Sequence, residues 1–145
     1  MASWAEFKRQ APELAAFGET RFASHVAYLG TLRADGSPRV HPVTPILGEQ
    51  LFLFMEPTSP KGKDLIRDPR YTLHCSVANM SGGEGEFYVS GRAAPVNDPL
   101  LREQAARASP YPPEERYILF VLSIDLAFMH TYTDGQTNPR RWQAG

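Results

Sequence analysis

The sequence YLGTLRADGSPRVHPVTPILGEQLFLFMEPTSPKGKDL, residues 28–65, decides the fold of this chain. Residues 26–33 and 38–46 have the alternating pattern of strands and flank an Asp-Gly turn, which predicts a β-hairpin. Residues 51–55 are apolar throughout, which favours a strand buried on both faces. A loop with two lysines then leads into a short helix over residues 61–67. This stretch therefore predicts an antiparallel meander of three strands that delivers a cationic loop to the end of a β-sheet.

The flanking sequence adds more strands and a few short helices. Ser3 is a candidate N-cap with Glu6 three residues later, and Pro12 divides the N-terminal helical region, at about residues 3–24, into two helices. Asp98 followed by Pro99 predicts a helix that ends at about residue 108. Further strands are expected at residues 70–78, 86–96, 117–124 and 127–133. We therefore expect one mainly β domain over residues 1–145, with a barrel at about 26–133 that closes to remove exposed edges, and a tail at 134–145.

The composition is that of an ordinary globular protein, with 42% hydrophobic and 21% charged residues and a formal net charge of −1. Such a balance gives no general attraction to nucleic acid or to an anionic membrane, so neither is an expected partner. Cys75 is the only cysteine, which favours a reducing compartment. The first residues lack an apolar core typical of a leader, and no segment has the roughly 20 apolar residues that span a bilayer. We therefore expect a cytoplasmic protein.

The loop before the predicted helix at residues 61–67 has the chemistry of a phosphate site. Thr58 and Ser59 offer hydroxyl groups, and Lys61 and Lys63 offer positive charge, all within six residues. A helix N-terminus adds main-chain N–H donors and a favourable dipole. The alternative is that both lysines are simply solvated in a turn.

Arg39 and His41 alternate along the second strand of the hairpin, so their side chains share one face, opposite Val40 and Pro42. Beside the lysine loop, this face could line an anionic pocket; the alternative places both side chains on a solvated surface. His41 is the one candidate for a general acid or base, because an imidazole exchanges protons near neutral pH.

Other familiar sites are not indicated by the sequence. His25, His74 and His130 lack the spacing of metal ligands, so no metal site is expected. Cys75 and its neighbour His74 face opposite ways in a strand, which argues against a nucleophile–base pair. Motifs of serine hydrolases, P-loop proteins and dinucleotide-binding folds are also missing from the sequence.

The segments YLGTLRADGSPRVHPVTPI, LFLF, TSPKGKDLIRDPR and GEFYVSGRA, in this order, resemble the pyridoxamine 5′-phosphate oxidase-like split-barrel flavoproteins. The resemblance covers roughly residues 26–96. It implies a six-stranded antiparallel split barrel of the FMN-binding type, usually a homodimer with cofactor at the subunit interface. The chain lacks the full substrate-phosphate set of true pyridoxamine 5′-phosphate oxidases, so activity on that vitamer is not expected.

The resemblance also implies roles for particular residues. Main-chain groups of the Arg39-Val40-His41-Pro42 strand would contact the isoalloxazine ring. The phosphate would be held by Ser59 and Lys61, with Thr58 and Lys63 nearby. Arg141 and Trp142 are of the same residue types as a C-terminal pair that helps to close the flavin site in the family. The alternative is that they fasten the C-terminus to the core. Relatives of this size bind FMN, the deazaflavin F420, or in some branches haem or biliverdin.

Three functional hypotheses follow. The first is an FMN-dependent oxidoreductase that acts on a small molecule, with an F420-dependent reductase as its variant. In such an enzyme the cofactor carries the redox chemistry and the protein supplies placement and electrostatics. The second is a binding protein that carries a flavin, haem or another tetrapyrrole without turnover. The third is a degenerate barrel that has lost its cofactor.

Overall fold

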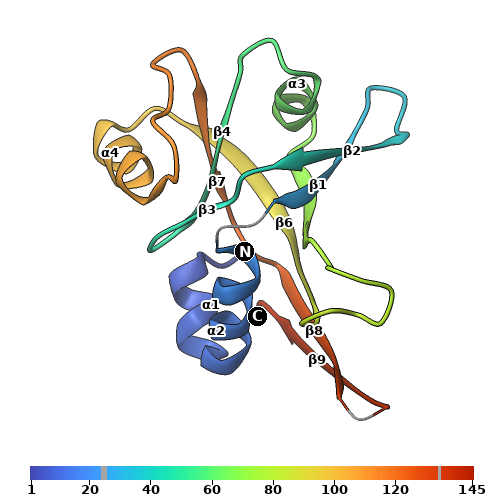
Figure 1. Cartoon of the computed structure of the whole chain (residues 1–145). Helices are drawn as coiled ribbons and strands as arrows, with labels where there is room; N and C mark the ends of the chain where they lie inside the picture. The colour runs from blue at the N-terminus through green and yellow to red at the C-terminus, as the bar shows by residue number, and fades with distance from the viewer. Residues whose placement is uncertain (24–25, 134) are drawn as a thin grey trace.

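The computed structural model describes residues 1–23, 26–133 and 135–145; His25, named above, lies outside the described residues. Four helices and one antiparallel sheet of nine strands make up the described part (Figure 1). The helices are α1 (Trp4–Gln10), α2 (Pro12–Phe22), α3 (Pro60–Arg67) and α4 (Pro99–Ala108). The strands are β1 (Ala27–Leu32), β2 (Pro38–Val43), β3 (Ile46–Leu47), β4 (Leu51–Met55), β5 (Arg70–Cys75), β6 (Glu86–Val96), β7 (Ile118–Leu122), β8 (Leu126–Thr133) and β9 (Gln136–Gln143).

The sheet is curled into a half-barrel. It stays open between its two edge strands, β2 and β3, which follow one another in the chain. Its main path runs β2-β1-β5-β6-β7-β4-β3, while β8 pairs with the long strand β6 and with β9. The predicted second strand, residues 38–46, breaks at Thr44-Pro45 into β2 and β3, which lie at opposite ends of this path. The mainly β split-barrel fold is confirmed, but full closure of the barrel was a wrong expectation, since β2 and β3 remain edges.

The described sheet has nine strands instead of six or seven, because residues 38–46 form two strands and the tail adds another; the pairing of the first strands also differs from the prediction. The predicted three-stranded meander is two separate hairpins, β1–β2 and β3–β4, because β4 pairs with β7 and not with β2. The tail at 134–145 contains strand β9, which extends the sheet from β8. Its Asn, Pro and Arg residues have little strand propensity, so cross-strand packing determines this element.

The core lies inside the curl of the sheet and beneath two groups of helices. Strand β4 divides its side chains between two apolar clusters, and this explains its uninterrupted apolar sequence. Leu51 and Leu53 join the main core with Leu29, while Phe52 joins a smaller cluster with Ala105 of α4.

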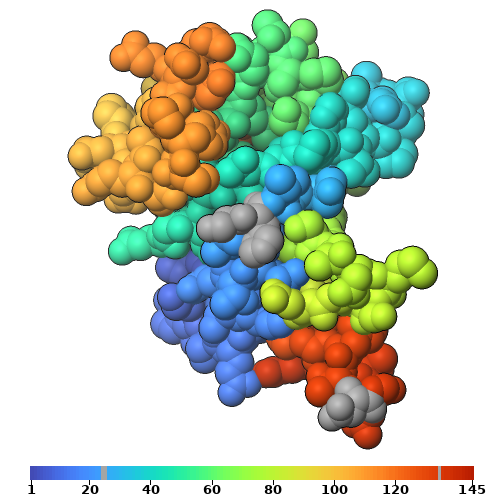
Figure 2. Space-filling view, in the orientation of Figure 1, coloured from blue at the N-terminus to red at the C-terminus, as the bar shows by residue number. Residues whose placement is uncertain are grey.

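Helices α1 and α2 cover the end of the barrel formed by β6 and β8. The Ser3 hydroxyl accepts a hydrogen bond from the Glu6 N–H, and Pro12 begins α2, as the sequence predicts. Contact with the sheet is close, because a Cβ atom at Gly18 would lie only 2.4 Å from the Phe87 ring. Helix α3 instead lies against β1 and β6, at the opposite end of the molecule (Figures 1 and 2).

Candidate functional site

The site centres on the first turn of α3. Ser59 is its N-cap, with its Oγ accepting a hydrogen bond of 3.2 Å from the Gly62 N–H. Gly62 leaves room for this cap, since a Cβ there would lie 2.9 Å from Ser59 Oγ. Lys61 is half-buried and Lys63 exposed, and neither forms an ion pair within the described part of the chain. The predicted cationic helix start is therefore present, with Thr58 exposed in the loop before it.

Strand β2 places its two polar side chains on the side of α3. Arg39 and His41 are half-buried, whereas Val40 and Pro42 are exposed on the opposite face, as the alternation predicts. The Arg39 Nε donates a hydrogen bond of 2.7 Å to Oδ2 of Asp64, in the second turn of α3. Arg39 is thus part of a packed polar cluster and does not lie on a freely solvated surface.

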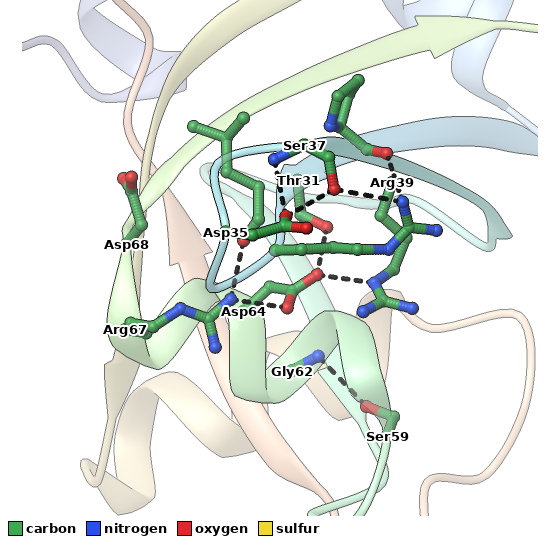
Figure 3. Close-up of polar contacts among 12 residues, drawn as sticks. Thr31, Asp35, Ser37, Arg39, Ser59, Gly62, Asp64, Arg67 and Asp68 are labelled. Atoms are coloured by element: carbon green, nitrogen blue, oxygen red, sulfur yellow. Dashed lines mark hydrogen bonds and ion pairs between the residues drawn. The ribbon is translucent and has the colours of Figure 1, made fainter.

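Asp64 is the centre of this cluster, and its side chain is only 3% exposed. Its Oδ2 also accepts a hydrogen bond of 2.8 Å from the Thr31 hydroxyl, and its Oδ1 accepts one of 2.8 Å from Arg67 Nη2. The same Arg67 nitrogen donates to the Leu32 carbonyl at 2.8 Å. In Figure 3 the carboxylate lies between the two guanidinium groups, with Thr31 beside it. Three elements, β1, β2 and α3, therefore meet at one buried charge.

A shallow hollow of about 470 Å³ opens beside this cluster. Four of its nine lining residues are cations and two are carboxylates. The lining residues are Arg33, Ala34, Asp35, Arg39, Thr58, Pro60, Lys63, Asp64 and Arg67. The side chain of Arg33 is fixed at the rim by hydrogen bonds to the Pro38 carbonyl, at 3.0 Å, and to Ser37 Oγ, at 3.4 Å.

The cations change the acidity of their neighbours. The pKa of His41 is lowered, first by burial and then by the positive charges of Lys61 and Arg39, so its imidazole is neutral at pH 7. Burial by itself would raise the pKa of Asp64, but the hydrogen bonds from Arg67, Thr31 and Arg39 outweigh it and the pKa is lowered. The site thus combines a neutral imidazole, an ionised buried carboxylate and an excess of fixed positive charge, a combination that suits a phosphate.

Strand β2 is also an edge, so part of its main chain has no strand partner. Because proline cannot donate to a ladder, Pro38 and Pro42 occupy positions where the main chain points away from the neighbouring strand. Val40 lies two residues from each and has the same orientation. Its N–H and its own carbonyl are therefore available to a planar ligand that carries hydrogen-bonding groups along one edge.

The outer face of the sheet carries a row of rings that begins at this edge. Directly paired residues share a face, and the register aligns one residue from each of six strands. From β2 to β9 these residues are Pro42, Tyr28, His74, Tyr88, Phe128 and Arg141. The rings of His74 and Tyr88 are stacked at 5.8 Å, and those of Tyr88 and Phe128 lie 5.3 Å apart. Tyr28 is 44% exposed, so this face is an apolar surface that the described chain leaves partly open.

The two C-terminal candidates, Arg141 and Trp142, lie on opposite faces of β9. Trp142 contacts the ring of Phe7 at 4.9 Å and donates to Gln10 Oε1 at 3.3 Å, so it fastens β9 to α1. Arg141 lies on the outer face, at the far end of the row of rings. Within one chain, neither residue is brought together with Lys61, because β9 and α3 occupy opposite ends of the molecule (Figure 1).

Other candidate sites find little support in the described residues. No group of three histidine, cysteine or carboxylate side chains among them could hold a metal ion. Cys75 is buried, and its sulfur accepts a hydrogen bond from the Phe87 N–H at 3.2 Å. No helix in the described ranges is long and apolar enough to cross a bilayer.

The residues that the sequence analysis missed are Thr31, Asp64 and Arg67. A signal was present, since Asp64 and Arg67 are three residues apart in a predicted helix and could have been read as an ion pair. Burial of Asp64 beside Thr31 and Arg39 depends on how α3 packs on the hairpin β1–β2. Local sequence does not specify such packing.

Replacement of Asp64 tests its role in the cluster. We expect Asp64→Ala to lower the free energy of unfolding by about 3 kcal/mol, because two guanidinium groups and a hydroxyl lose their acceptor. Asp64→Asn, which keeps one acceptor oxygen, should lose less.

The same cluster should make stability depend on pH. Since the pKa of Asp64 is lowered in the folded state, its contribution to the free energy of unfolding should be present at neutral pH and disappear as the pH falls through that pKa. Urea unfolding at several pH values measures both effects, with Asp68→Ala, at an exposed pair with Arg70, as the control; equal losses at both positions would contradict the assignment.

The acidity of His41 tests how close Lys61 lies. We expect its imidazole to titrate below the ordinary value of 6.5, and Lys61→Ala to raise its pKa only part of the way, since burial is the larger cause. His74 is the internal control, because its hydrogen bond to Cys75 raises its pKa and Lys61 is not among the causes. Histidine NMR signals followed against pH give both values. If the pKa of His41 is the same in Lys61→Ala as in the wild-type protein, these two side chains do not lie close together.

Solved structures provide three comparisons for the fold. A haem-binding protein from Mycobacterium smegmatis is 20% identical with a TM-score of 0.67, over 86% of this chain but only 57% of that one. General Stress Protein 26 from Bacillus anthracis is 16% identical with a TM-score of 0.67, over 91% of this chain and 98% of that one. A NimC/NimA family protein from Clostridium acetobutylicum is 18% identical with a TM-score of 0.68, over 96% and 94%. At these identities the likeness concerns the fold alone.

The sequence matches no curated protein. Residues 11–130, however, match the family described as pyridoxamine 5′-phosphate oxidase. The matched range includes the hairpin β1–β2, the loop before α3 and all of the Asp64 cluster. Because it extends over most of the sequence, the chain belongs to the pyridoxamine 5′-phosphate oxidase family.

Proposed function

We propose that this protein binds a phosphate-bearing flavin, with FMN favoured over the deazaflavin F420, and uses it as an oxidoreductase on a small molecule. The observation that supports the proposal best is the arrangement of Arg39, His41 and Lys61 at the start of α3, beside an edge strand with free main-chain groups. These are the two kinds of contact that a flavin phosphate and a flavin ring require. The single buried Cys75 is consistent with the cytoplasmic location that we include in the proposal.

The residues fit such a cofactor by their chemistry. The phosphate would be held by Lys61, the Arg39 guanidinium and the Ser59 hydroxyl, whose hydrogen remains free to donate while its oxygen caps α3. The ring edge would be held by the main chain of β2 around Val40. The cofactor, when bound, supplies the capacity to accept and return a hydride or electrons.

The chain's own contribution is placement and control of charge. Asp64 holds Arg39 by its Nε, which leaves both Nη groups available to an anion and fixes the plane of the guanidinium. His41 is neutral at pH 7, so it can donate or accept one hydrogen bond without adding a charge beside the phosphate. Placement in advance reduces the side-chain ordering that binding would otherwise require.

A homodimer with cofactor at the interface is part of the proposal. The outer row of rings and the exposed Val40 offer an apolar surface next to the proposed ring position. A second copy packed on this face would cover the surface and bring its own Arg141, which also lies on the outer face, towards the cofactor. Trp142 would act indirectly, since it is packed against Phe7 and holds β9 in place.

Removal of the Lys61 ammonium is the direct test of the phosphate position. We expect Lys61→Ala to weaken FMN binding by about 1.5–3 kcal/mol, or about 10- to 150-fold, the range for a hydrogen bond to a charged group. Riboflavin, which lacks the phosphate, should bind equally well to both proteins. Fluorescence titration measures each affinity, and Arg9→Ala, at an exposed position of α1, is the control. An unchanged FMN affinity in Lys61→Ala would overturn the placement.

A second candidate function is haem or tetrapyrrole binding without turnover. One observation favours it: the outer row joins the imidazole of His74, a candidate iron ligand, to the rings of Tyr88 and Phe128. One of the structural neighbours is itself a haem-binding protein. This function uses the outer face of the sheet and does not require the cations of α3.

The absorption spectrum of the purified protein distinguishes the two functions. The protein is mixed with FMN, F420 or haemin in turn and then desalted. We expect a retained flavin or deazaflavin band that Lys61→Ala reduces and His74→Ala does not. A retained haem band with the reverse dependence would replace the oxidoreductase proposal with the binding function. Retention of none of the three chromophores would contradict both.

A further inference from the structure

Helix α3 directs its two lysines to different sides of Arg39. Lys61 lies near enough to His41 for its charge to lower the imidazole pKa. Lys63 instead lines the hollow of about 470 Å³, together with Arg33 and Arg67. Ser59, Lys61 and His41 do not line that hollow, while Arg39 does. The proposed phosphate contacts therefore account for only one of two cationic surfaces.

The hollow has more positive charge than its own carboxylates neutralise. Its lining includes four cations, Arg33, Arg39, Lys63 and Arg67, and two carboxylates, so 4 − 2 leaves a formal excess of two positive charges. Both oxygens of Asp64 are already occupied by donors from Thr31, Arg39 and Arg67. The other carboxylate, Asp35, accepts from the Ser37 N–H at 2.9 Å and from its hydroxyl at 2.6 Å.

Several donors in the hollow have no partner within the described residues. Arg39 uses only its Nε and Arg67 only its Nη2, so Arg39 has two Nη groups free and Arg67 retains Nη1. Lys63 and the exposed Thr58 add an ammonium and a hydroxyl. Such a convergence of charged donors around one concave surface is the arrangement that binds oxyanions.

We propose that this hollow is a second anion subsite, which takes a phosphate or carboxylate group other than the one held at Lys61. Arg39 lies between the two subsites and is shared by them, while Asp64 fixes it there. The anion comes either from a cofactor that carries negative groups beyond its phosphate or from a separate anionic molecule. The pairing with a first phosphate rests on the proposed function, whereas the affinity of the hollow for an oxyanion does not.

The test compares ligands with one and with several anionic groups. FMN carries one phosphate; F420 carries carboxylates beyond its phosphate; inorganic pyrophosphate serves as the free anion, added to protein with and without FMN. Each is titrated calorimetrically into the wild-type protein, Lys61→Ala, Lys63→Ala and the control Arg9→Ala. Lys63 is exposed and forms no ion pair or hydrogen bond among the described residues, so its replacement should leave the fold intact.

We expect the FMN affinity of Lys63→Ala to stay within about twofold of the wild-type value. Its affinity for F420 or for pyrophosphate should fall by about tenfold or more. A loss for F420 assigns the second anion to the cofactor, and a loss for pyrophosphate on FMN-loaded protein assigns it to a separate molecule. An equal loss of FMN affinity in Lys61→Ala and Lys63→Ala would mean that both lysines hold the same phosphate, which would overturn the proposal. So would a Lys63→Ala protein that binds all three ligands like the wild type.

The proposed function can fail independently of this inference. If the wild-type protein binds neither FMN nor F420, the flavin proposal is wrong, and pyrophosphate added to the cofactor-free protein still tests the hollow. Binding that Lys63→Ala weakens by about tenfold supports the subsite. Binding that is absent, or that Lys63→Ala leaves unchanged, overturns it.

Discussion

The arrangement of the candidate site depends on one buried carboxylate. Asp64 accepts hydrogen bonds from β1, β2 and its own helix, so it joins the first hairpin of the sheet to α3. A buried charge is costly unless it is fully paired, and the three donors supply that pairing. The same contacts fix Arg39 at the start of α3. A substitution at Asp64 therefore changes both the stability of the fold and the position of the Arg39 charge.

Strand β2 uses its two faces and its open edge for different purposes. One face directs Arg39 and His41 towards α3 and so contributes charge. The other face exposes Val40 and Pro42 and continues into the row of rings on the outer sheet. The open edge contributes uncommitted main-chain groups. The proposed ligand, a flat ring with a charged tail, would use all three, and Pro38 and Pro42 occur at the unpaired positions of the open edge.

The sequence predicted the local elements well because their signals are local. Ser3 as cap of α1, Asp98 as cap of α4 and the Asp-Gly turn all depend on residues a few positions apart. The split of residues 38–46 and the addition of β9 were not predictable in this way, since they depend on pairing between distant strands. Asp64 was missed for the same reason. The local sequence gives an aspartate in a short, mostly charged helix, and only the packing of α3 on the hairpin β1–β2 makes it buried.

The prolines of β2 have a consequence for the protein without any ligand. An exposed edge strand is a template on which a strand from another molecule can add and start aggregation. Pro38 and Pro42 remove two of the donors that such a strand would need, so at this edge a foreign chain finds acceptors but few N–H groups. A small planar molecule needs far fewer hydrogen bonds than a strand. The same residues thus limit the addition of a foreign strand at this edge, and under the proposed function they leave the edge open to a ring.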